Sequence, residues 1–517
     1  MRRHIVGLFV LAALVALPAL LDAQEPRTVT GQVTAAETRQ PLSAVRVTVK
    51  GTFVTTTTDR EGRFRLQVPA NATTLEFAYI GYKKAEAPVQ SEMQIALERQ
   101  AVILEGLVVT ALGVEREKRS VGTSVQGVSG ADIAAVPKLN VVNSLQGQVA
   151  GVQVTDAGPT GGTARILIRG SSSIASNNQP LFIVDGIPID NSAAGFGYTR
   201  NEGFGGIDRG NAAQDIDPNN VESYSVLKGP NAAALYGSRA QNGAIVITTK
   251  SGRSDALGVT LSSSFTTEQP LRLPRYQNLY GQGVGGAFQW VDGNGAGTWD
   301  DVDESWGPRL DGRLIDQFTG LAQPWVPHPN NIRDFFRTGT TFNTNMAISR
   351  ATQTSNVRLS LTSTQVEGMA PGNAIGRLGL AVKGGAAIND RLSTEASLNY
   401  VNQDADDRPG TGYDEDNPLQ SFIWFGRQND MEALRHYRCD GSEPTPCQIG
   451  GQYNWNYNYH NNPFWEQFVN GNGDERDRLL GHVQLTYQLN DWLSATGRVG
   501  RDWYRDHRKD VIAPTSL

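Results

Sequence analysis

The stretch 225-SVLKGPNAAALYGSRAQNGAIVITTK-250 places a lysine, two glycines and a short alanine run directly before an apolar segment. A phosphate-binding loop uses similar residues, but its lysine follows the last glycine into a helix. Here Lys228 precedes Gly229, and the segment after Gly237 has the pattern of a strand. The order instead predicts a short helix that starts at Pro230, makes one or two turns over Ala232–Leu235 and exits in a left-handed conformation at Gly237.

Composition excludes several classes of function. The chain has 517 residues, 39% of them hydrophobic, which is enough for several packed domains. A net charge of −6 and the lack of a basic stripe argue against nucleic-acid binding. The 56 glycines, together with many Ser, Thr and Asn residues, favour β-structure with turns. HExxH and GxSxG motifs are absent, so we predict no catalytic residues, no enzyme activity and no cofactor.

Residues 1–23 have the pattern of a secretory signal peptide. Arg2 and Arg3 precede an apolar run from Ile5 to Leu21, and Ala23 is a small residue at which a signal peptidase could cut. A membrane anchor is the alternative, but the run is short and contains a proline. Leu21 departs from the small residue expected at its position, which leaves the cut site open. The pattern predicts an exported chain.

The only two cysteines, Cys439 and Cys447, bracket the polar stretch DGSEPTP. In an exported chain such a pair favours a local disulfide that closes an exposed loop. Two free or metal-binding thiols are the alternative, although no CxxC or HxxxH lies nearby to support zinc.

Residues 27–98 predict a small β-sandwich. Apolar residues alternate with polar ones at Val45, Val47 and Val49 and again at Phe64, Leu66 and Val68, with turn residues between the strands. The turn DREGRF (59–64) and the later YIGYKK (79–84) resemble the carboxypeptidase-regulatory-like domain, a transthyretin-type sandwich. No zinc-peptidase ligands accompany it, so a role as a spacer or docking module is favoured over an accessory role in peptidase chemistry.

Residues 102–114 contain a short extended run, LVVT, between polar flanks. Such a run can add itself as a strand to the sheet edge of a partner protein. The stretches that follow are more specific: NVVNSLQGQVAGVQVTDAGPTGGTARILIRGSSSI (140–174), NNQPLFIVDGIPIDN (177–191) and DIDPNNVESYSVLKGPNAAALYGSRAQNGAIVITTK (215–250). They closely resemble the plug domain of the SusC/RagA family of TonB-linked outer-membrane transporters, and the quoted opening stretch resembles its closing signature.

The resemblance implies a role for individual residues. The TonB contact falls on Leu107, Val108, Val109 and Thr110, and the plug signature falls on Arg169, Gly170, Asp185, Gly186, Lys228, Gly229, Tyr236, Gly237 and Gly243. It implies as partners TonB with the ExbB and ExbD motor, a SusD-like surface lipoprotein, outer-membrane lipid and a glycan or peptide cargo. The N-terminal sandwich would lie in the periplasm of a Gram-negative cell.

Residues 115–252 predict a compact α/β plug domain. Asn140 can cap a helix in which Val141, Val142, Leu145 and Val149 share one face and which Gly151 ends. Strands are expected at 166–168, 181–184, 223–227 and 244–248, and their apolar runs indicate burial on both faces. Four charges flank these strands and must be paired or solvated, either inside a polar lumen or at an ordinary surface: Arg165, Arg169, Asp185 and Asp217.

Residues 257–517 contain segments of about ten residues in which apolar and polar side chains alternate. In 355-SNVRLSLTST-364, for example, Val357, Leu359 and Leu361 would face one side while the residues between them face the other. A polar second face is typical of a membrane barrel with a wet interior, although a soluble sandwich also alternates. The complete fold class is therefore mainly β: a sandwich, an α/β plug and an antiparallel transmembrane β-barrel.

The number of predicted strands is too small for a complete barrel. Large plugged transporters have about 22 strands, but at about ten residues per strand this part of the chain provides seven or eight. So few strands cannot close around a plug, and open edges in lipid would leave unpaired backbone groups. We therefore expect a truncated sequence that carries only the N-terminal part of a barrel.

Two loop segments are weaker candidates for ligand sites. The stretch from Asp292 approaches a calcium loop, with oxygen ligands at Asp292, Asn294, Asp300 and Asp303, but Ala296 and the lack of a terminal Glu favour a plain surface loop. In 453-YNWNYNYHNNPFW-465 aromatic rings alternate with amides, which suits a sugar or peptide ligand, an interfacial aromatic belt or a loop core.

Two functions remain after this reading. The first is energised import of glycans or peptides across the outer membrane, in which TonB pulls on the plug. The second is a secreted or surface adhesion protein built of β-domains. The sequence does not identify the cargo, the residues that touch it or the oligomeric state.

Overall fold

The computed structural model describes the chain in segments: 27–36, 39–43, 45–50, 52, 54–69, 72–79, 82, 84–97, 107–109, 115–117, 125–134, 137–156, 158, 160–174, 178–191, 205–229, 231–252, 257–289, 302–352, 354–413, 417–443 and 447–517. The predicted signal peptide lies outside these residues. Among them, no helix combines the length and the apolar character that a membrane span requires. The chain divides into two compact units, Met1–Glu105 and Gly106–Leu517.

The first unit is the predicted β-sandwich. One sheet has the order β4-β1-β7 and the other β3-β2-β5-β6. The six alternating apolar residues singled out in the sequence are all buried between the sheets. The strands are β1 (Arg27–Ala35), β2 (Arg46–Val49), β3 (Thr55–Thr57), β4 (Arg63–Val68), β5 (Thr74–Ala78), β6 (Ala85–Pro88) and β7 (Glu92–Leu97).

The second unit begins with a two-stranded ladder, followed by an α/β module over residues 125–252, which we call the plug module. A five-stranded sheet of order β10-β16-β17-β13-β14 forms its centre, and the hairpin β11-β12 packs beside it. The strands are β8 (Leu107–Val109), β9 (Glu115–Glu117), β10 (Val125–Ser129), β11 (Val152–Asp156), β12 (Ala164–Ile168), β13 (Leu181–Val184), β14 (Ile187–Ile189), β15 (Gly205–Ile207), β16 (Val221–Leu227) and β17 (Ala244–Thr249).

The helices of the plug module are short. They are α2 (Gly130–Ala134), η3 (Val141–Leu145), η5 (Ala212–Asp215), η6 (Pro218–Asn220), α3 (Asn231–Tyr236) and η7 (Ser238–Ala240). Asn140 caps η3 as predicted, because its Oδ1 accepts the Val142 N–H at 3.2 Å. The helix expected to reach Gly151 is nevertheless a single 3₁₀ turn that ends at Leu145. Gly147 has φ of +75°, which takes the backbone out of the helical region.

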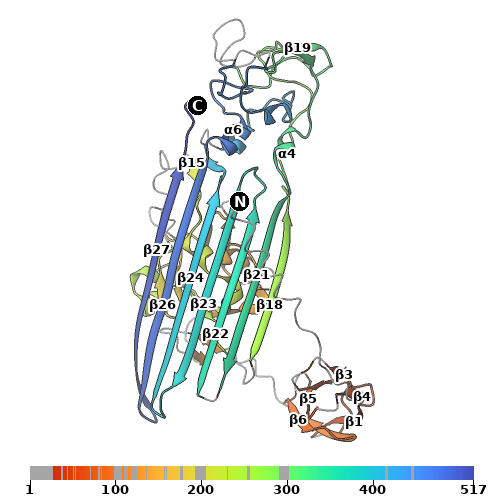
Figure 1. Ribbon diagram of the computed structural model, residues 1–517, viewed down its shortest axis with the longest axis vertical. Helices are drawn as coiled ribbons and strands as arrows, with labels where there is room; N and C mark the ends of the chain where they lie inside the picture. The colour runs from red at the N-terminus through yellow and green to blue at the C-terminus, as the bar shows by residue number, and fades with distance from the viewer. Residues whose placement is uncertain are drawn as a thin grey trace. The chain divides into compact units, whose positions relative to one another are not determined.

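Seven long antiparallel strands form the third part, which we call the curved sheet. Their order, β18-β21-β22-β23-β24-β26-β27, is that of an uninterrupted meander (Figure 1). The strands are β18 (Gly258–Glu268), β21 (Gly339–Ala351), β22 (Ser355–Glu367), β23 (Ala374–Ala387), β24 (Leu392–Asp406), β26 (Asn472–Asn490) and β27 (Leu493–Asp510). Within the described segments the sheet does not close, and β18 and β27 are its edges, in line with the strand count from the sequence.

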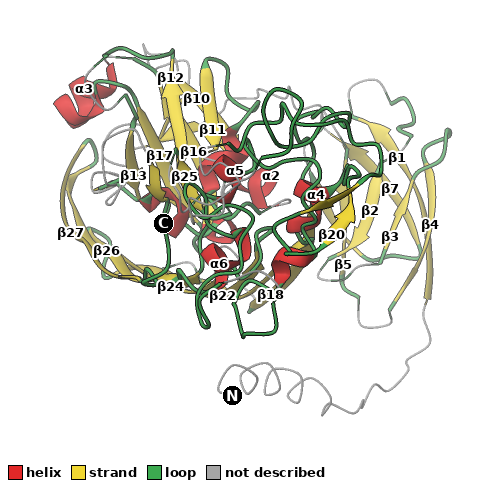
Figure 2. Ribbon diagram, turned by 90° about the horizontal axis from the view of Figure 1, so that it is seen from above, coloured by secondary structure: helices red, strands yellow, loops and turns green. Residues whose placement is uncertain are grey.

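The curved sheet exposes apolar side chains and buries polar ones. On β22, Val357, Leu359 and Leu361 are 42 to 50% exposed, whereas Arg358, Ser360 and Thr362 are buried. Seen from above, the strands form an arc along one side of the plug module (Figure 2). The plug module therefore covers the polar face of the sheet. This inverted pattern is the one expected of a barrel wall with lipid outside and a polar interior.

The two ends of the curved sheet differ. Short turns join β21 to β22, β23 to β24 and β26 to β27 at one end. The turn over 368–373 and the two long connections, 269–338 and 407–471, lie at the other end. In transmembrane barrels short turns face the periplasm and long loops face outward. The described residues of the long connections pack together into what we call the outer cap, which holds β19 (Leu314–Asp316), β20 (Ala322–Pro324), α4 (Asn331–Phe335), β25 (Gly410–Gly412), α5 (Pro418–Ser421), η8 (Ala433–Arg435) and α6 (Pro463–Phe468).

An aromatic cluster forms the core of the outer cap. Phe335 touches Phe422 and Phe464 at ring-centroid distances of 5.1 and 5.4 Å, so both long connections contribute to it. The aromatic and amide stretch from Tyr453 is part of this core, with Trp455 and Trp465 fully buried. Of the three roles considered for that stretch, the structure therefore favours a loop core.

Candidate functional site

The contact between the plug module and the curved sheet is the candidate functional site. It is made mainly of polar and charged groups, with a few apolar contacts such as Leu480 of β26 against the plug core. Four clusters form much of the polar contact, and in each a plug group meets residues that are far away in sequence. Outside these clusters, Arg209 of the plug module pairs with Asp510 of β27. A small cavity lined by Val184, Asp215 and Arg478, among others, lies between the two parts.

The first cluster centres on Asp185, at the turn between β13 and β14. Asp185 and Gly186 both have positive φ, 47° and 82°, as a two-residue Asp-Gly hairpin requires. This turn directs the carboxylate back onto Thr249, whose N–H donates to it at 3.0 Å. Lys383 of β23 completes the cluster, with its Nζ 3.0 Å from Asp185 Oδ1. Both side chains are at least nine-tenths buried, so the pair is shielded from water.

The second cluster follows from the sequence Asp217-Pro-Asn-Asn. Asp217 caps η6 by accepting the Asn219 N–H at 2.9 Å, and its other oxygen accepts the hydroxyl of Thr362 on β22. Asn219 donates to Asn343 of β21 at 3.2 Å, and Asn220 accepts from Arg358 of β22. This short helix and its N-cap residue thus present three polar side chains to three sheet residues.

The third cluster is an ionic network around Asp215. Its carboxylate lies 2.9 Å from Arg478 and 3.7 Å from Arg476, both on β26. Each arginine also pairs with a carboxylate of the neighbouring strand β27, at Asp502 and Asp506 respectively. The arginines therefore keep a partner within the curved sheet even without the plug, which lowers the cost of separating the two parts.

The fourth cluster holds the plug turn at Gly161. Arg408, only 1% exposed, binds Asp474 at 2.6 Å and donates from Nη1 to the Gly161 carbonyl at 3.1 Å. Gly161 has φ of +73°, and a Cβ there would lie 2.4 Å from Ile375 Cδ1 of the curved sheet. The close approach therefore requires glycine.

Substituting Gly161→Val should loosen the plug module in the curved sheet. A β-branched side chain at positive φ costs about 1–3 kcal/mol, and the contact with Ile375 adds to that. We expect faster hydrogen exchange of the β11-β12 hairpin, measured by mass spectrometry. Gly158→Val is the control, because Gly158 also has positive φ but a Cβ there would meet nothing within 4 Å. Equal exchange in both variants would show that contact with the sheet does not hold this turn.

The signature residues named from the sequence occupy turns and supports of the plug module. Gly170, Gly186, Gly229, Gly237 and Gly243 all have positive φ, and so do Arg169 and Asp185. A Cβ at Gly229 would lie 2.9 Å from Arg169 Nη1, which brings two signature positions together. Helix α3 ends at Tyr236, directly before the left-handed Gly237, as predicted.

Lys228 has a structural partner set within the plug module. Its Nζ donates to the Ala150 carbonyl at 2.6 Å and to Gln126 Oε1 at 3.0 Å. The side chain is 9% exposed. The ammonium group of Lys228 is bound to these two acceptors and not placed to bind a phosphate. The order of lysine and glycine in the sequence also argued against a nucleotide-binding loop.

The predicted TonB-contact segment is extended. Leu107–Val109 form β8, which pairs antiparallel with β9, with Val108 opposite Arg116. Thr110 lies outside the described residues. The ladder has two strands, so among the described residues one edge of β8 has no strand partner and could pair with a strand of another protein.

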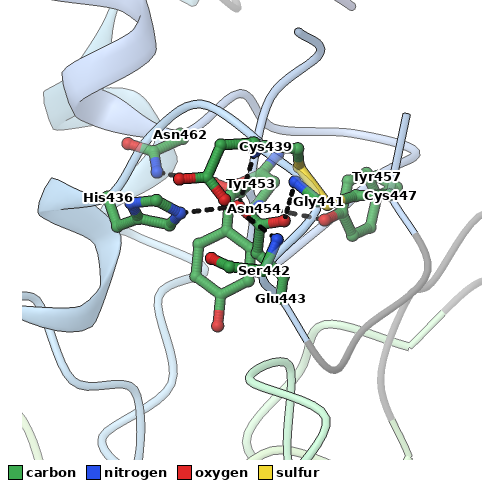
Figure 3. The surroundings of a disulfide bond; sticks show 11 residues. His436, Cys439, Gly441, Ser442, Glu443, Cys447, Tyr453, Asn454, Tyr457 and Asn462 are labelled. Carbon is green, nitrogen blue, oxygen red and sulfur yellow. Dashed lines mark hydrogen bonds and ion pairs between the residues drawn. A yellow bond between two sulfur atoms is a disulfide. The ribbon is translucent and has the colours of Figure 1, made fainter. Parts of the chain in front are cut away.

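The predicted disulfide joins Cys439 to Cys447 in the outer cap (Figure 3). Between the two cysteines, Glu443 accepts the N–H groups of Asp440 and Gly441 at 2.8 and 2.9 Å and lies 2.6 Å from His436 Nε2. The backbone hydrogen bond from Asp440, together with the contact to His436, lowers the pKa of Glu443 from 4.5 to about 2. The ionised carboxylate thus braces the loop that the disulfide closes.

Because the pKa of Glu443 is lowered by folding, its stabilisation should be present above pH 4.5 and lost as the pH falls toward 2. Glu443→Gln should make the loop more sensitive to proteolysis at pH 7 and remove this pH dependence. The rate of protease cleavage within residues 439–447, measured from pH 3 to 7, checks the expectation. A variant that keeps the wild-type pH profile would contradict it. Glu432→Gln is the control, since Glu432 is exposed and its carboxylate pairs with Arg435 outside the disulfide-closed loop.

The calcium prediction concerns four residues, of which three, Asp292, Asn294 and Asp300, lie outside the described residues. Asp303 is described and is 3.2 Å from His460 Nε2, so it links the two long connections of the outer cap. The groups of potential metal ligands in the described chain do not include Asp303. Both groups lie at the disulfide and share Glu443. The two cysteine sulfurs are bonded to each other, and Glu443 is bound to His436 and to the backbone of Asp440.

Sequence reasoning found part of this interface and missed part of it. Asp185 and Asp217 meet the curved sheet, whereas Arg165 and Arg169 are exposed on the plug surface. Asp215 and the arginines at 408, 476 and 478 were not identified. A signal existed in 474-DERDR-478, because alternation along a strand places Asp474, Arg476 and Arg478 on one face.

Comparisons with known proteins agree with this architecture. Residues 117–244 match the TonB-dependent Receptor Plug Domain, and residues 29–109 match the CarboxypepD_reg-like domain. The TonB-dependent receptor SusC of Bacteroides thetaiotaomicron is 36% identical over 217 residues, which cover 42% of this chain and 20% of that protein. TonB-dependent receptor P3 of Formosa agariphila is 32% identical over 259 residues, which cover 49% of this chain and 23% of that protein.

A solved structure of the RagAB peptide importer in its open-open state has the same fold. The TM-score is 0.56 at 20% sequence identity, over 78% of this chain and 43% of that one. The chain therefore spans about a fifth of the length of the curated relatives and less than half of the RagAB chain. The predicted fold class of sandwich, plug and incomplete antiparallel barrel is confirmed, and the families matched are those of receptors rather than of enzymes. The chain thus carries a CarboxypepD_reg-like domain followed by a TonB-dependent Receptor Plug Domain, and over these parts it is similar to TonB-dependent receptors of the SusC type.

Proposed function

We propose that this chain takes part in TonB-dependent import of glycans or peptides across the outer membrane, with the plug module gating the barrel. One observation carries the proposal: the polar face of the curved sheet is buried by a separate α/β module through ionic and hydrogen-bonded contacts. Apolar side chains face away from that module. A wall of this kind suits a water-lined passage through lipid, and the plug module would close it.

The chemistry of the interface is consistent with a plug that moves. Polar groups that separate can be re-solvated by water, so their separation costs less than exposing an equal apolar area does. In the Asp215 network, Arg476 and Arg478 retain Asp506 and Asp502 when Asp215 leaves. The interface thus holds the plug module in one defined position and still allows it to separate from the curved sheet.

The energy source that we propose is TonB, driven by ExbB and ExbD, acting on the segment Leu107–Thr110. An extended strand with a free edge can be gripped by main-chain hydrogen bonds to a partner's sheet, which resist a pull along the chain. The proposal includes a SusD-like surface lipoprotein as partner and a periplasmic position for the N-terminal sandwich. It also holds that the chain performs no covalent chemistry.

The cargo class is supported by a structural relative, since RagAB is a peptide importer. Growth of a strain that lacks the gene, supplied with single glycan or peptide sources, tests the function. We expect growth to fail on one source class and to return with the full-length gene. Normal growth on every source, together with recovery of the protein in the soluble fraction, would instead favour the adhesion hypothesis.

Embedding in the membrane has a separate test in the intact protein. A folded barrel migrates faster in gel electrophoresis before heating than after it, because detergent does not unfold it. We expect such heat-modifiable migration in outer-membrane extracts. Identical migration before and after heating would contradict a barrel.

A further inference from the structure

The strand β15 of the plug module leaves the body of the module and pairs with the outer cap. Gly205, Gly206 and Ile207 lie opposite Gly412, Thr411 and Gly410 of β25 in an antiparallel ladder. The Thr411 hydroxyl also donates to the Gly206 carbonyl at 2.8 Å. The two strands form a sheet of their own, at the end of the curved sheet from which the outer cap rises (Figure 1).

On the plug side the ladder is tied to the module by a very short connection. Ile207 is followed directly by Asp208, a buried residue whose carboxylate accepts both the N–H and the hydroxyl of Thr163 at 2.7 Å. Thr163 precedes β12, and Asn211 adds a bond to the Ala164 carbonyl at 2.9 Å. Any displacement of the plug module therefore carries β15 with it.

On the cap side the ladder is tied to the aromatic core. The Gly412 carbonyl accepts from Asn417 Nδ2 at 2.7 Å, and Asn417 also caps α5 by accepting the Leu419 N–H at 3.0 Å. Helix α5 leads directly into Phe422, whose ring lies 5.1 Å from that of Phe335. Displacement of β25 is therefore passed to residues at the centre of the outer cap.

The ladder is built from residues that form weak strands. Four of its six residues are glycine, which loses the most conformational freedom on folding and offers no side chain to pack. Gly206 also has φ of +126°, which other residues rarely adopt. The pairing thus depends on the two supports that hold the strands in register, and it separates easily when one support moves.

From this geometry we infer that the β15-β25 ladder couples the position of the plug module to that of the outer cap. With the plug seated, the ladder holds Gly410–Gly412 and Asn417–Phe422 of the outer cap in place. When the plug moves, the ladder separates and that segment is released. The inference rests on the proposed function for the force that moves the plug, but the coupling itself exists without that force.

Hydrogen exchange of the full-length chain in detergent, followed by mass spectrometry, tests the coupling. Gly206→Val strains the plug strand and should speed exchange in the cap peptide 418–425 about tenfold, as expected when a local support is lost. Gly147→Val is the matched control. Gly147 has positive φ in the same module, but a Cβ there would meet nothing within 4 Å. The coupling is refuted if cap exchange is the same in both variants.

A second, milder variant changes the outer cap and measures the effect on the plug strand. Thr411→Val keeps a β-branched side chain but removes the hydroxyl bond to Gly206, so exchange of 205–207 should rise about fivefold, the effect of one hydrogen bond. Unchanged exchange of 205–207 would count against the inference. These measurements need no cargo and no TonB, so a failure of import would leave the coupling result intact, and the reverse also holds.

Discussion

Deletion of residues 107–110 should abolish energised uptake while the protein still reaches the outer membrane and still binds cargo at the cell surface. The deletion removes β8, the strand that we propose TonB grips, and leaves the plug module and the curved sheet intact. Without that grip no force reaches the plug, so uptake should fall to background. Transport of labelled cargo into cells, measured beside surface binding at 4 °C, gives both quantities.

Two point variants sharpen this test. Val108→Pro removes a backbone N–H and disfavours strand pairing, so it should reproduce the deletion. Val108→Thr keeps a β-branched residue of good strand propensity, so it should retain most uptake. The transport mechanism is wrong if the deletion strain takes up cargo at the wild-type rate.

Replacing Arg408 by alanine should produce the largest loss of stability of any single change in the interface. Arg408 and Asp474 are 1% and 2% exposed, so the variant leaves a buried carboxylate without its cation. Breaking a buried pair on one side typically costs about 3–5 kcal/mol. The Gly161 carbonyl also loses its donor. Urea unfolding of the detergent-solubilised protein measures the change in the free energy of unfolding.

The control is the double variant Arg408→Met, Asp474→Val, which removes both charges with little change in the total side-chain volume. Apolar replacement of a whole buried pair is often neutral, so the double variant should be at least about 2 kcal/mol more stable than Arg408→Ala. If the single variant were as stable as wild type, Arg408 would not be the anchor of the Gly161 turn.

The elements whose pattern is local were predicted well. Strand β13 occupies 181–184 as expected, because four consecutive apolar residues before an Asp-Gly turn leave few alternatives. The alternation in 355–364 predicted which side chains of β22 face away from the plug. The short helix after Lys228 was predicted from the position of two glycines and a proline.

The features that depend on distant residues were not accessible in this way. Asp215 and Arg478 are 263 positions apart, and nothing in either local sequence specifies the other. The stretch from Tyr453 was ambiguous between ligand site and core, because Phe335 and Phe422, which complete the core, lie in other segments. The length of η3 was overestimated because apolar spacing does not reveal the positive φ of Gly147.

The central claim is that the plug module must move against the barrel wall for cargo to pass, and a reversible cross-link tests it most directly. A Cβ at Gly500 of β27 would lie 2.8 Å from Ile187 Cγ1 of β14. The Cβ atoms of an Ile187→Cys, Gly500→Cys pair would therefore be about 4 Å apart, the spacing that a disulfide needs.

The measurement is cargo uptake by cells that carry this pair, with and without reductant. Each single-cysteine variant and the wild type serve as controls, because reductant also reaches the disulfide between Cys439 and Cys447. We predict background uptake when the cross-link is complete, recovery on reduction and no such effect in the controls. Full uptake through a chain whose plug is completely cross-linked to the wall would contradict the account.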